Sequence, residues 1–362
     1  MKLFSKLVIY TFLLTIAFSA CQVPSDPQNA TWPLIGFNKQ DELNPILVPD
    51  KGQTFLCPKR DSVIQWEARN VLNPTAFVKD KKVYLVYRAQ DEDMTSRLGL
   101  AISEDGLNFK KESEPIFYPA NDDMIGYEWP GGVEDPRIVE SESGEYILTY
   151  TAYDGKVARL FIASSNDLHT WTKHGPVLGE GKYINTWSKA GAIVSRLEGN
   201  RIIATMIDGK YWMYFGDTEL FMATSEDLKT WSVLEDTQLD KKISVLHPRR
   251  GFFDSRLVEP GPFALLQEDG ILLIYNSMNA KEYNDESLPV GTYAAGQALF
   301  DKTRPYQLKD RMTEHFIHPD KDYERVGEVN EVCFVEGLVY FKNKWFLYYG
   351  TADSKIAVAV RD

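Results

Sequence analysis

The chain has 362 residues, of which 40 are Lys or Arg and 52 are Asp or Glu, and its formal net charge is −12. This balance argues against a nucleic-acid partner, whose phosphates need a basic face, and against adhesion to anionic lipid. Phe, Trp and Tyr make up 13% of the residues. Aromatic rings stack on the C–H faces of sugars and carboxylates accept sugar hydroxyls, so the composition favours an oligosaccharide.

The first 20 residues have the pattern of an export signal. Lys2 and Lys6 precede an apolar run over residues 7–18, which is too short to span a membrane. We therefore predict a signal peptide over residues 1–20 and an exported protein.

The end of this signal, Phe-Ser-Ala-Cys, resembles a bacterial lipobox. This resemblance implies cleavage before Cys21 and lipidation of that cysteine, so that the protein meets a bacterial membrane only through this anchor, in the periplasm or at the cell surface. An ordinary signal cut near Ala20 is the alternative. Residues 21–31 are polar and contain proline, as expected of a tether.

A nine-residue pattern occurs three times, about 60 residues apart. The copies are AISEDGLNF (101–109), ASSNDLHTW (163–171) and ATSEDLKTW (223–231). Each is typical of a strand end, a tight turn held by the Asp, and a hydrophobic return anchored by Phe or Trp. An all-β repeat of this length indicates a propeller blade.

A second series of apolar segments ends in Tyr, with Asp or Asn four residues later. Its members are residues 83–91, 146–154, 271–279 and 345–353, with residues 201–208 as a weaker fifth. Five strand signals predict five blades, because each short sheet of a propeller packs only on its neighbours. We expect an all-β, five-bladed β-propeller over residues 32–362, as one domain without a linker.

Two cysteines remain after the lipobox, Cys57 and Cys333. They show neither CxxC spacing nor an adjacent His, so they indicate no zinc site and no disulfide scaffold. We predict buried free thiols, with a pairing in an oxidising compartment as the alternative. No metal or organic cofactor is predicted.

The most polar motif in an apolar setting is Gly131 to Arg137, GGVEDPR. Its glycines let the backbone approach a ligand, Pro136 fixes the turn, and the acidic pair beside Arg137 offers charges whose pKa values can be pushed apart. By itself the motif is more typical of a turn held by an Asp–Arg salt bridge than of a catalytic site.

Further short motifs follow one another over ~280 residues, and as an ordered set they are more specific than any one of them. They are Asn73-Pro74, Tyr87-Arg88-Ala89, Gly132 to Arg137, the repeated Ser-x-Asp-Leu-x-x-Trp, Ser188-Lys189, Phe253-Asp254-Ser255, Glu259-x-Gly261-Pro262, Glu336-Gly337 and Tyr348-Tyr349-Gly350-x-x-Asp353. In this order they resemble glycoside hydrolase family 130, the mannoside phosphorylases and β-mannosidases built on a five-bladed propeller.

The resemblance implies roles for single residues. Asp135 matches the family's general acid, which protonates the glycosidic oxygen through the 3-hydroxyl of the bound mannose. The residues that match the sugar-binding set at the −1 position are Asn73, Arg88, Lys189 and Asp353. For Arg88 and Asp353 the alternative is an ion pair between blades. We also include Glu134, Arg137, Asp254, Arg97 and Arg159 among the expected substrate-binding residues.

The second catalytic partner decides between two inverting reactions. A phosphorylase uses inorganic phosphate and needs a cationic pocket, whereas a hydrolase needs a second carboxylate ~6.5–9.5 Å from the acid, with a water between them. The residues four before the Ala of each repeat are Arg97, Arg159 and Glu219. Glu219 thus places a carboxylate where its counterparts place cations, and it is a candidate base. Glu259, which matches a glutamate of the family's hydrolases, is the other candidate.

Departures from the phosphorylase pattern also favour hydrolysis. Residues 193–195 are Ile-Val-Ser where phosphorylases tend to have Phe-Pro-Glu, and Asn276 stands where they tend to have His. Arg249-Arg250 beside His247 keeps phosphorolysis open, since such a pair can bind phosphate, although a solvated basic turn is the simpler explanation. Export favours hydrolysis as well, because a sugar phosphate is useful only inside the cell.

The working hypothesis is a lipid-anchored, inverting glycosidase that cleaves β-1,2- or β-1,4-linked mannosides, with Asp135 as acid and Glu219 or Glu259 as base. A β-mannoside phosphorylase that releases mannose 1-phosphate is the first alternative, and a non-catalytic glycan-binding lipoprotein is the second. Candidate stacking platforms for the +1 sugar are Trp129, Trp187, Trp212 and Tyr293.

Overall fold

The computed structural model describes residues 31–179 and 181–362. The predicted signal peptide, Cys21 and nearly all of the tether lie outside these residues. The helices of the described part are single turns, α1 (Ile125–Glu128) and α2 (Asp322–Arg325). Within that part, no helix has the length and apolar character needed to cross a membrane.

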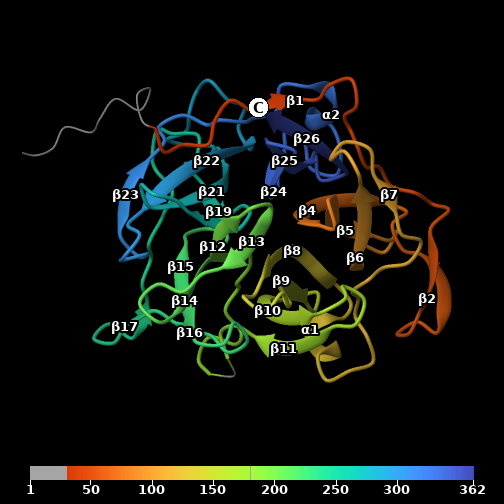
Figure 1. The fold of residues 1–362 in the computed structure, drawn as a ribbon. Coiled ribbons are helices and arrows are strands. Elements are labelled where there is room, and N and C mark those ends of the chain that lie inside the picture. Colours follow the sequence, from red (N-terminus) through yellow and green to blue (C-terminus); the bar gives the residue numbers. More distant parts are fainter. Residues whose placement is uncertain (1–30, 180) are drawn as a thin grey trace, which may run out of the picture. The chain divides into compact units, whose positions relative to one another are not determined.

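The strands form five antiparallel sheets around a common centre, each of which we call a blade (Figure 1). Blade 1 contains β4 (Asn70–Lys79), β5 (Lys82–Gln90), β6 (Ser96–Ser103) and β7 (Lys110–Lys111). Blade 2 contains β8 (Gly132–Glu140), β9 (Tyr146–Tyr153), β10 (Ala158–Ser165) and β11 (Thr172–Pro176). Blade 3 contains β12 (Ala192–Glu198), β13 (Arg201–Ala204), β14 (Tyr211–Phe215), β15 (Phe221–Ser225) and β16 (Ser232–Val233).

The remaining two blades follow the same order. Blade 4 contains β19 (Leu257–Pro260), β20 (Ala264–Leu266), β21 (Ile271–Met278), β22 (Tyr293–Phe300) and β23 (Leu308–Arg311). Blade 5 contains β24 (Cys333–Phe341), β25 (Lys344–Thr351), β26 (Lys355–Arg361) and the N-terminal strand β1 (Asn38–Lys39). Two short hairpins lie outside the blades: β2 (Thr54–Cys57) with β3 (Ser62–Gln65), and β17 (Glu235–Asp236) with β18 (Lys241–Lys242). The predicted five-bladed β-propeller is confirmed.

Four of the predicted strands coincide with the second strands of their blades, β5, β9, β21 and β25. The fifth prediction, residues 201–208, is partly wrong, because only Arg201–Ala204 is a strand there. The second strand of blade 3 is divided: β13 pairs with the far half of β12, and β14 pairs with its near half through Ala192 and Ile193. The Tyr and Asp of the second series are therefore Tyr214 and Asp217 in this blade.

The repeated turns have the structure expected from their sequence. In blade 2, Asp167 Oδ1 accepts the backbone N–H groups of His169 (2.9 Å) and Thr170 (2.7 Å). The indole of Trp171 donates to the Leu168 carbonyl at 2.8 Å and so anchors the return of the chain. The Asp satisfies backbone donors that a tight turn would otherwise leave open.

The second strand of each blade has at least one fully buried tyrosine. Because an aromatic ring fills the space between blades while its hydroxyl needs a polar partner, each donates a hydrogen bond there. The tyrosines and their acceptors are Tyr87 with Glu67 (2.8 Å), Tyr150 with Glu128 (2.9 Å), Tyr214 with the Pro305 carbonyl (2.6 Å), Tyr275 with Asp254 (2.8 Å) and Tyr348 with the Gly106 carbonyl (2.8 Å).

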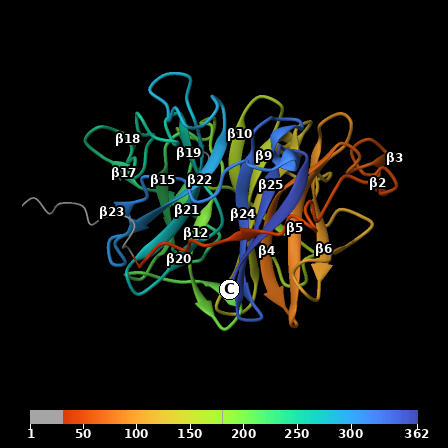
Figure 2. The same cartoon turned by 90° about the horizontal axis from the view of Figure 1, so that it is seen from above.

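The ring is closed by the N-terminal segment. Figure 2 shows this segment crossing from blade 4 to blade 5, where β1 pairs with β26 and adds the outer strand of the last sheet. The buried amide of Gln297 holds the segment, accepting from Leu34 N–H at 2.8 Å and donating to the Leu34 carbonyl at 2.7 Å. Lys39 adds an ion pair with buried Glu324 at 2.7 Å.

We expect Gln297→Ala to weaken this closure. The substitution leaves a buried N–H and a buried C=O of Leu34 without partners, which costs roughly 1–3 kcal/mol for each group. Denaturant unfolding should show a clearly lowered midpoint. The matched control is Gln307→Ala on the exposed surface of blade 4, which should change stability by less than ~0.5 kcal/mol; equal effects of the two variants would contradict the proposed closure.

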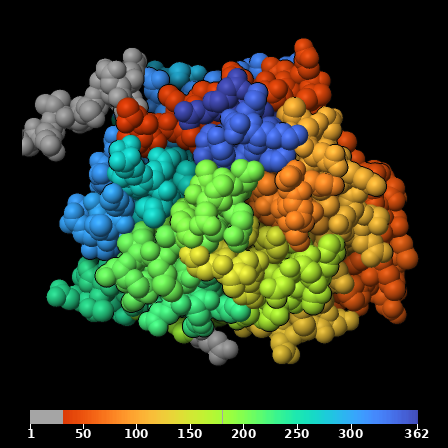
Figure 3. Space-filling model, viewed as in Figure 1, coloured from red at the N-terminus to blue at the C-terminus, as the bar shows by residue number. Residues whose placement is uncertain are grey.

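Turns between the first and second strands of the blades cover the face seen in Figure 3, where yellow, green, orange and blue segments surround the centre. The polar residues described next lie near the opposite ends of the first strands. Cys57 and Cys333 are both free and buried, which confirms the prediction for the thiols.

Candidate active site

The first strands of the blades lose their regular pairing at the positions of polar residues. The pairing of β4 with β5 shifts between Leu72 and Pro74, that of β8 with β9 between Glu134 and Arg137, and that of β24 with β25 between Val335 and Gly337. In blade 4 the first strand is interrupted after Pro260. The residues displaced from regular pairing are Asn73, Asp135 with Pro136, and Glu336.

Local chemistry explains these irregularities. Pro74, Pro136 and Pro260 cannot donate a backbone hydrogen bond, so they interrupt a ladder where they stand. Asn73 and Asp135 have φ values of 48° and 49°, a region that Asn and Asp tolerate better than most residues. Bulges of this kind redirect side chains and are frequent beside active sites.

Asp135 lies at the centre of the resulting cluster. Its Oδ1 accepts from Asn73 Nδ2 at 2.6 Å and from Arg88 Nη1 at 3.0 Å. Its Oδ2 lies 3.2 Å from Lys189 Nζ. Blade 1 and the segment leading into blade 3 thus both contact one buried carboxylate of blade 2.

The electrostatics of the neighbouring carboxyls diverge. Burial alone would raise the pKa of Asp135, but Lys189, Arg88 and Arg137, together with the hydrogen bond from Asn73, hold this pKa well below its usual range. Glu134 pairs with Arg88 at 2.6 Å, yet burial raises its pKa. The two adjacent acids therefore prefer different protonation states, a pattern typical of acid–base sites.

Arg137 ties blade 2 to blades 4 and 5. It donates to the carbonyls of Pro260 (2.7 Å) and Gly261 (2.9 Å), and to its own neighbour Asp135 (3.0 Å). Its Nη2 also lies 2.8 Å from a carboxylate oxygen of Glu336, whose pKa is raised well above the usual range by burial. Arg137 therefore holds the acid's backbone at a fixed place relative to the Glu259–Gly261 segment.

Glu259 stands out among the buried carboxylates. It is 5% exposed, and its Oε1 has no hydrogen-bond partner among the described residues. Burial raises its pKa to about 7, against the opposing effects of Lys189 and Arg137. A carboxylate that is half ionised near neutral pH, and that keeps a free acceptor atom, is suited to take a proton.

Glu219, the other predicted base, lies in the turn between β14 and β15 and is half-buried. The turn is bonded at both ends to site segments: Gly216 N–H donates to the Lys189 carbonyl (2.9 Å), and Val258 N–H donates to the Thr218 carbonyl (3.2 Å). The structure therefore brings Glu219 to the edge of the site, while Glu259 lies deeper in it.

Asp353 follows β25 and has a φ of 48°. Burial raises its pKa to about 6, and Arg88, Asp135 and Lys189 are among the charges that act on it. Asp353 therefore belongs to the same cluster, as the sequence predicts. Tyr293, on β22, is half-buried and feels the charges of Glu259 and Asp353.

Three predicted substrate-binding residues do not contact Asp135. Arg97 is fully buried and pairs with Asp91 at 2.9 Å. Arg159 pairs with Asp154 at 2.8 Å. Asp254 is fully buried between Arg249 (2.7 Å) and Arg311 (2.6 Å). Each is paired with an opposite charge within its own region, and a substrate-binding role for them stays a prediction.

The expected cationic mouth built from Arg97 and Arg159 also needs correction. In blades 1 and 2 the Asp at the end of the second strand pairs with the Arg that begins the third, as Asp91–Arg97 and Asp154–Arg159. In blade 3 the corresponding residues are Asp217 and Glu219, which cannot pair. The sequence comparison thus found a real exception: the charge of Asp217 acts on Lys189 and Glu259, and both carboxylates act on Lys242.

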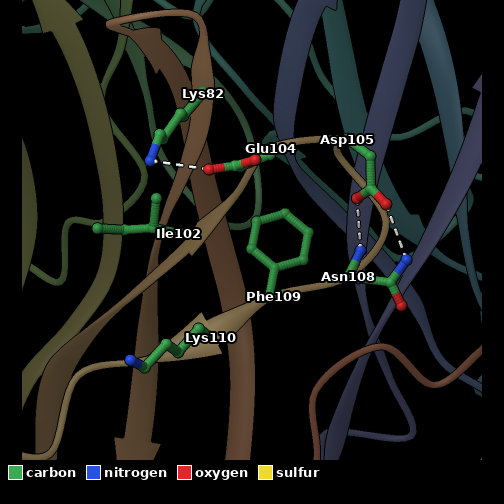
Figure 4. Close-up of a pocket in the computed structure, with 7 residues that line it drawn as sticks. All are labelled: Lys82, Ile102, Glu104, Asp105, Asn108, Phe109 and Lys110. Atoms are coloured by element: carbon green, nitrogen blue, oxygen red, sulfur yellow. Dashed lines mark hydrogen bonds and ion pairs between the residues drawn. The ribbon is translucent and has the colours of Figure 1, made fainter.

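A separate pocket lies on the outer part of blade 1, lined by Lys82, Glu104, Asp105, Asn108 and Phe109, among others (Figure 4). Its polar groups satisfy each other: Lys82 pairs with Glu104 at 3.1 Å, and Asn108 Nδ2 donates to Asp105 Oδ2 at 2.8 Å. It shares no residue with the Asp135 cluster. In the described residues no group of three or more His, Cys, Asp or Glu is arranged to hold a metal ion.

Sequence reasoning did not assign roles to Glu336 and Asp217. For Glu336 a signal was present: polar residues precede Pro in Asn73-Pro74, Asp135-Pro136 and Glu259-Pro260, and Glu336 precedes Gly337 at the same place in blade 5. Asp217 was missed because the second strand of blade 3 is divided, which shortens the spacing from Tyr to Asp.

Comparisons with known proteins agree with this geometry. A family model described as beta-1,4-mannooligosaccharide phosphorylase (Glyco_hydro_130) matches residues 45–362. The chain is 28% identical over 315 residues to the 1,2-beta-oligomannan phosphorylase of Thermoanaerobacter sp. (strain X514), with 84% of this chain and 93% of that protein covered.

Solved structures show the same likeness. A glycosyl hydrolase from Bacteroides ovatus is 40% identical with a TM-score of 0.89, covering 92% of this chain and 95% of that one. A structure described as "The GH130 family of mannoside phosphorylases contains glycoside hydrolases that target beta-1,2 mannosidic linkages in Candida mannan" is 41% identical with a TM-score of 0.89, covering 91% and 95%.

Proposed function

Because the chain belongs to glycoside hydrolase family 130, we propose that it hydrolyses β-mannosides with inversion, with Asp135 as acid and Glu259 as base. The observation that supports hydrolysis most directly is Glu259 itself. Its pKa of about 7 and its free acceptor oxygen, close to Lys189 and Arg137, suit a group that deprotonates water.

The charge balance of the site supports the same choice. The carboxylates whose charges act on one another here are Glu134, Asp135, Asp217, Glu259, Glu336 and Asp353, and the cations are Arg88, Arg137 and Lys189. Each of these cations is already paired with a carboxylate. No cation of the cluster is therefore left free to neutralise a phosphate dianion, whereas a neutral water needs none.

In the proposed reaction, Glu259 takes a proton from a water as the water oxygen bonds to the anomeric carbon. The bond from that carbon to the glycosidic oxygen breaks, and the oxygen receives a proton that originates from Asp135 and passes through the 3-hydroxyl of the mannose. The two carboxyls exchange protonation states, and the product has the opposite anomeric configuration.

Asp135 is ionised in the free protein, because its pKa is held low. Its protonated form therefore belongs to the substrate-bound state. A bound sugar adds burial, which raises the pKa of a carboxyl, and its hydroxyls compete with Lys189 for Oδ2. The 3.2 Å contact of Oδ2 with Lys189 is longer than the 2.6 Å bond of Oδ1 with Asn73. We therefore propose that substrate binding breaks the Lys189 contact and that Oδ2 is the oxygen that becomes protonated.

Phosphorolysis is the second candidate, favoured by the relatives named as phosphorylases. In the sequence, Arg249-Arg250 is a candidate phosphate site, but in the structure other residues contact both arginines. Arg249 pairs with Asp254 at 2.7 Å, and Arg250 lies over the ring of Tyr283 at 4.0 Å. This arrangement supports hydrolysis over a phosphate site at that turn.

We expect wild-type protein to release mannose from β-1,2-mannobiose in a phosphate-free buffer, at a rate that added phosphate leaves unchanged. Chromatography of the products with and without phosphate at about 10 mM, roughly tenfold above the upper end of the usual KM range, is the measurement, with β-1,4-mannobiose as the linkage comparison. Turnover that requires phosphate and yields mannose 1-phosphate would establish the phosphorylase instead.

We also propose export and lipid anchoring through Cys21, on the strength of the N-terminal sequence. Hydrolysis suits this location, because the reaction consumes no phosphate and releases free mannose rather than a sugar phosphate outside the cell. Mass spectrometry of membrane-extracted protein would show a diacylglyceryl-modified N-terminal cysteine, and Cys21→Ala would release the protein from the membrane. A mature N-terminus elsewhere would contradict the anchor.

A further inference from the structure

Glu336 is a buried carboxyl of the central cluster that takes no part in the steps proposed above. It lies on β24 at the point where the pairing with β25 shifts, and its side chain is 0% exposed. Neither of its carboxyl oxygens has a hydrogen-bond partner among the described residues. Buried ionised groups normally keep such partners, because burial without them is costly. The protonation state and the purpose of this carboxyl therefore need an explanation.

Blade 4 fixes the backbone from which Glu336 extends. The side-chain amide of Asn276, on β21, donates to the Val335 carbonyl at 3.0 Å and accepts from Val335 N–H at 2.7 Å. The chain after Pro260 also approaches closely, since a Cβ on Gly261 would lie 2.9 Å from the Val335 carbonyl oxygen. The strand segment that carries Glu336 therefore has little freedom to move relative to blade 4.

The contact between Glu336 and Arg137 differs from an ordinary ion pair. Arg137 Nη2 lies 2.8 Å from Glu336 Oε1, but its N–H bonds do not point at that oxygen. The directed hydrogen bonds of the guanidinium go to three backbone carbonyls instead. An ionised carboxylate beside a guanidinium usually accepts directed, paired hydrogen bonds, as Glu142 does from Arg196 at 2.6 and 3.1 Å. Glu336 has the geometry of a carboxyl that touches the guanidinium without forming such a pair.

The electrostatics of the cluster agree with this geometry. Burial raises the pKa of Glu336 well above its usual range, and this effect exceeds the opposing one of Arg137. The charges of Asp135 and Glu259 raise the pKa of Glu336 further. Arg137 in turn lowers the pKa values of Asp135 and Glu259. An ionised Glu336 would oppose that effect, because it would add a like charge close to both carboxyls.

From this geometry we propose that Glu336 is a positioning residue: it stays an uncharged carboxylic acid during the reaction and holds Arg137 in place, so that the guanidinium charge acts on the two catalytic carboxyls. The inference rests on the proposed function for the roles of Asp135 and Glu259. Arg137 is itself 2% exposed, so it remains closed to an anion from solution. Its charge thus helps Glu259 to ionise near neutral pH, as the proposed reaction requires.

Two substitutions separate the shape of Glu336 from its charge. Glu336→Leu keeps the volume and removes the polar group that holds the guanidinium. We expect it to lower kcat for β-1,2-mannobiose by about 10- to 100-fold, the order of a displaced catalytic group. KM should stay within about threefold, because the loss is in the reacting state. Glu336→Gln keeps an uncharged polar group of the same shape and should recover most of the lost rate. Equal losses in the two variants would overturn the proposal.

The pH dependence of kcat/KM distinguishes an uncharged Glu336 from an ionised one. In the proposed reaction, the pH at which kcat/KM begins to fall reports the pKa of Glu259, which is about 7. Glu336→Gln removes no charge from an uncharged acid, so this fall should begin at the same pH as in wild type. If Glu336 is ionised, the variant loses a negative charge near Glu259 and lowers its pKa. The fall would then begin about one pH unit or more lower, which would refute the uncharged state.

A double-mutant cycle tests whether Glu336 acts through Arg137. Arg137→Lys keeps the charge but cannot reproduce the three carbonyl contacts of the guanidinium. In that background Glu336→Leu should lower kcat by less than about threefold further, whereas full additivity would contradict the proposed route. The matched control is Glu67→Gln, a fully buried glutamate that pairs with Lys111 at 2.6 Å away from the Asp135 cluster. It should lower the melting temperature and leave kcat and its pH dependence unchanged.

Infrared spectroscopy tests the uncharged state without turnover, and so separates failure of this inference from failure of the proposed function. At about pH 8, roughly one unit above the pKa of Glu259, wild-type protein should show the C=O band of a buried protonated carboxyl that Glu336→Gln lacks. Absence of this band overturns the inference whatever reaction the enzyme performs. If the band is present but wild-type protein releases no mannose without phosphate, the hydrolase assignment fails and the uncharged Glu336 stands; the kinetic comparisons are then made with phosphate added.

Discussion

Replacing Asp135 with asparagine is expected to lower kcat for β-mannoside cleavage by about 10³- to 10⁴-fold, the upper range for loss of a general acid. Asparagine is the informative substitution, because Asp135 has a φ of 49° and asparagine tolerates that conformation. The amide can still accept from Asn73 and Arg88, so the local fold should survive while the transferable proton is lost. Initial rates on β-1,2-mannobiose measure the effect.

The control for this variant is Asp208→Asn, an exposed aspartate with a similar φ of 52°. It should leave both rate and stability unchanged. The same experiment addresses a non-catalytic glycan binder: a binder would keep its affinity after Asp135→Asn and show no turnover with the wild-type chain either. Loss of less than about tenfold in a variant that folds normally would remove Asp135 from the acid role.

Glu259→Gln is expected to have the second large effect, a fall of about 10²- to 10⁴-fold in kcat/KM. The pKa of Glu259 is about 7 in the free protein and the pKa of Asp135 is held below its usual range, so the reactive form, with Asp135 protonated and Glu259 ionised, holds as many protons as the free protein does below pH 7. Wild-type kcat/KM should therefore be constant below pH 7 and should fall by a factor approaching ten for each unit of pH above that value, because a proton must then be taken up. The residual kcat/KM of the variant, which has no Glu259 proton to move to Asp135, should fall with rising pH below pH 7 as well.

Azide provides a chemical rescue that distinguishes a base from a binding residue. It is a small anionic nucleophile that needs no deprotonation, so it should restore turnover in Glu259→Gln and yield α-mannosyl azide. Glu268→Gln, an exposed glutamate of the same blade, should behave as wild type. Rescue of Glu219→Gln, and not of Glu259→Gln, would transfer the base role to Glu219.

The sequence predicts the fold well because propeller blades repeat. Buried second strands that end in Tyr recur at 83–91, 146–154, 271–279 and 345–353, and each of these strands was found where predicted. The exception, residues 201–208, arises because the second strand of blade 3 is divided into β13 and β14. Pattern matching cannot anticipate this division, in which β13 and β14 pair with different halves of β12 and the segment between β13 and β14 lies outside the pairing.

The site is predicted less completely, for a different reason. Asn73, Arg88, Asp135 and Lys189 meet as expected, because each stands in a recognisable short motif; after Asn73 and Asp135 a proline also forces irregular backbone. Arg97, Arg159 and Asp254 are also charged residues in short motifs, but their partners Asp91, Asp154, Arg249 and Arg311 are determined by three-dimensional proximity. Sequence alone cannot say which charges are already neutralised.

The first strands of blades 1, 2, 4 and 5 and the segment that leads into blade 3 contribute to the same cluster, and the last sheet is completed by residues from the opposite end of the chain. Catalysis therefore depends on the closed ring of blades. If the N-terminal segment detaches, blade 5 can separate from blade 4, and Glu336 then separates from Glu259. Activity should thus disappear at a lower denaturant concentration than the secondary structure does, so an activity assay would detect opening of the ring before spectroscopy does.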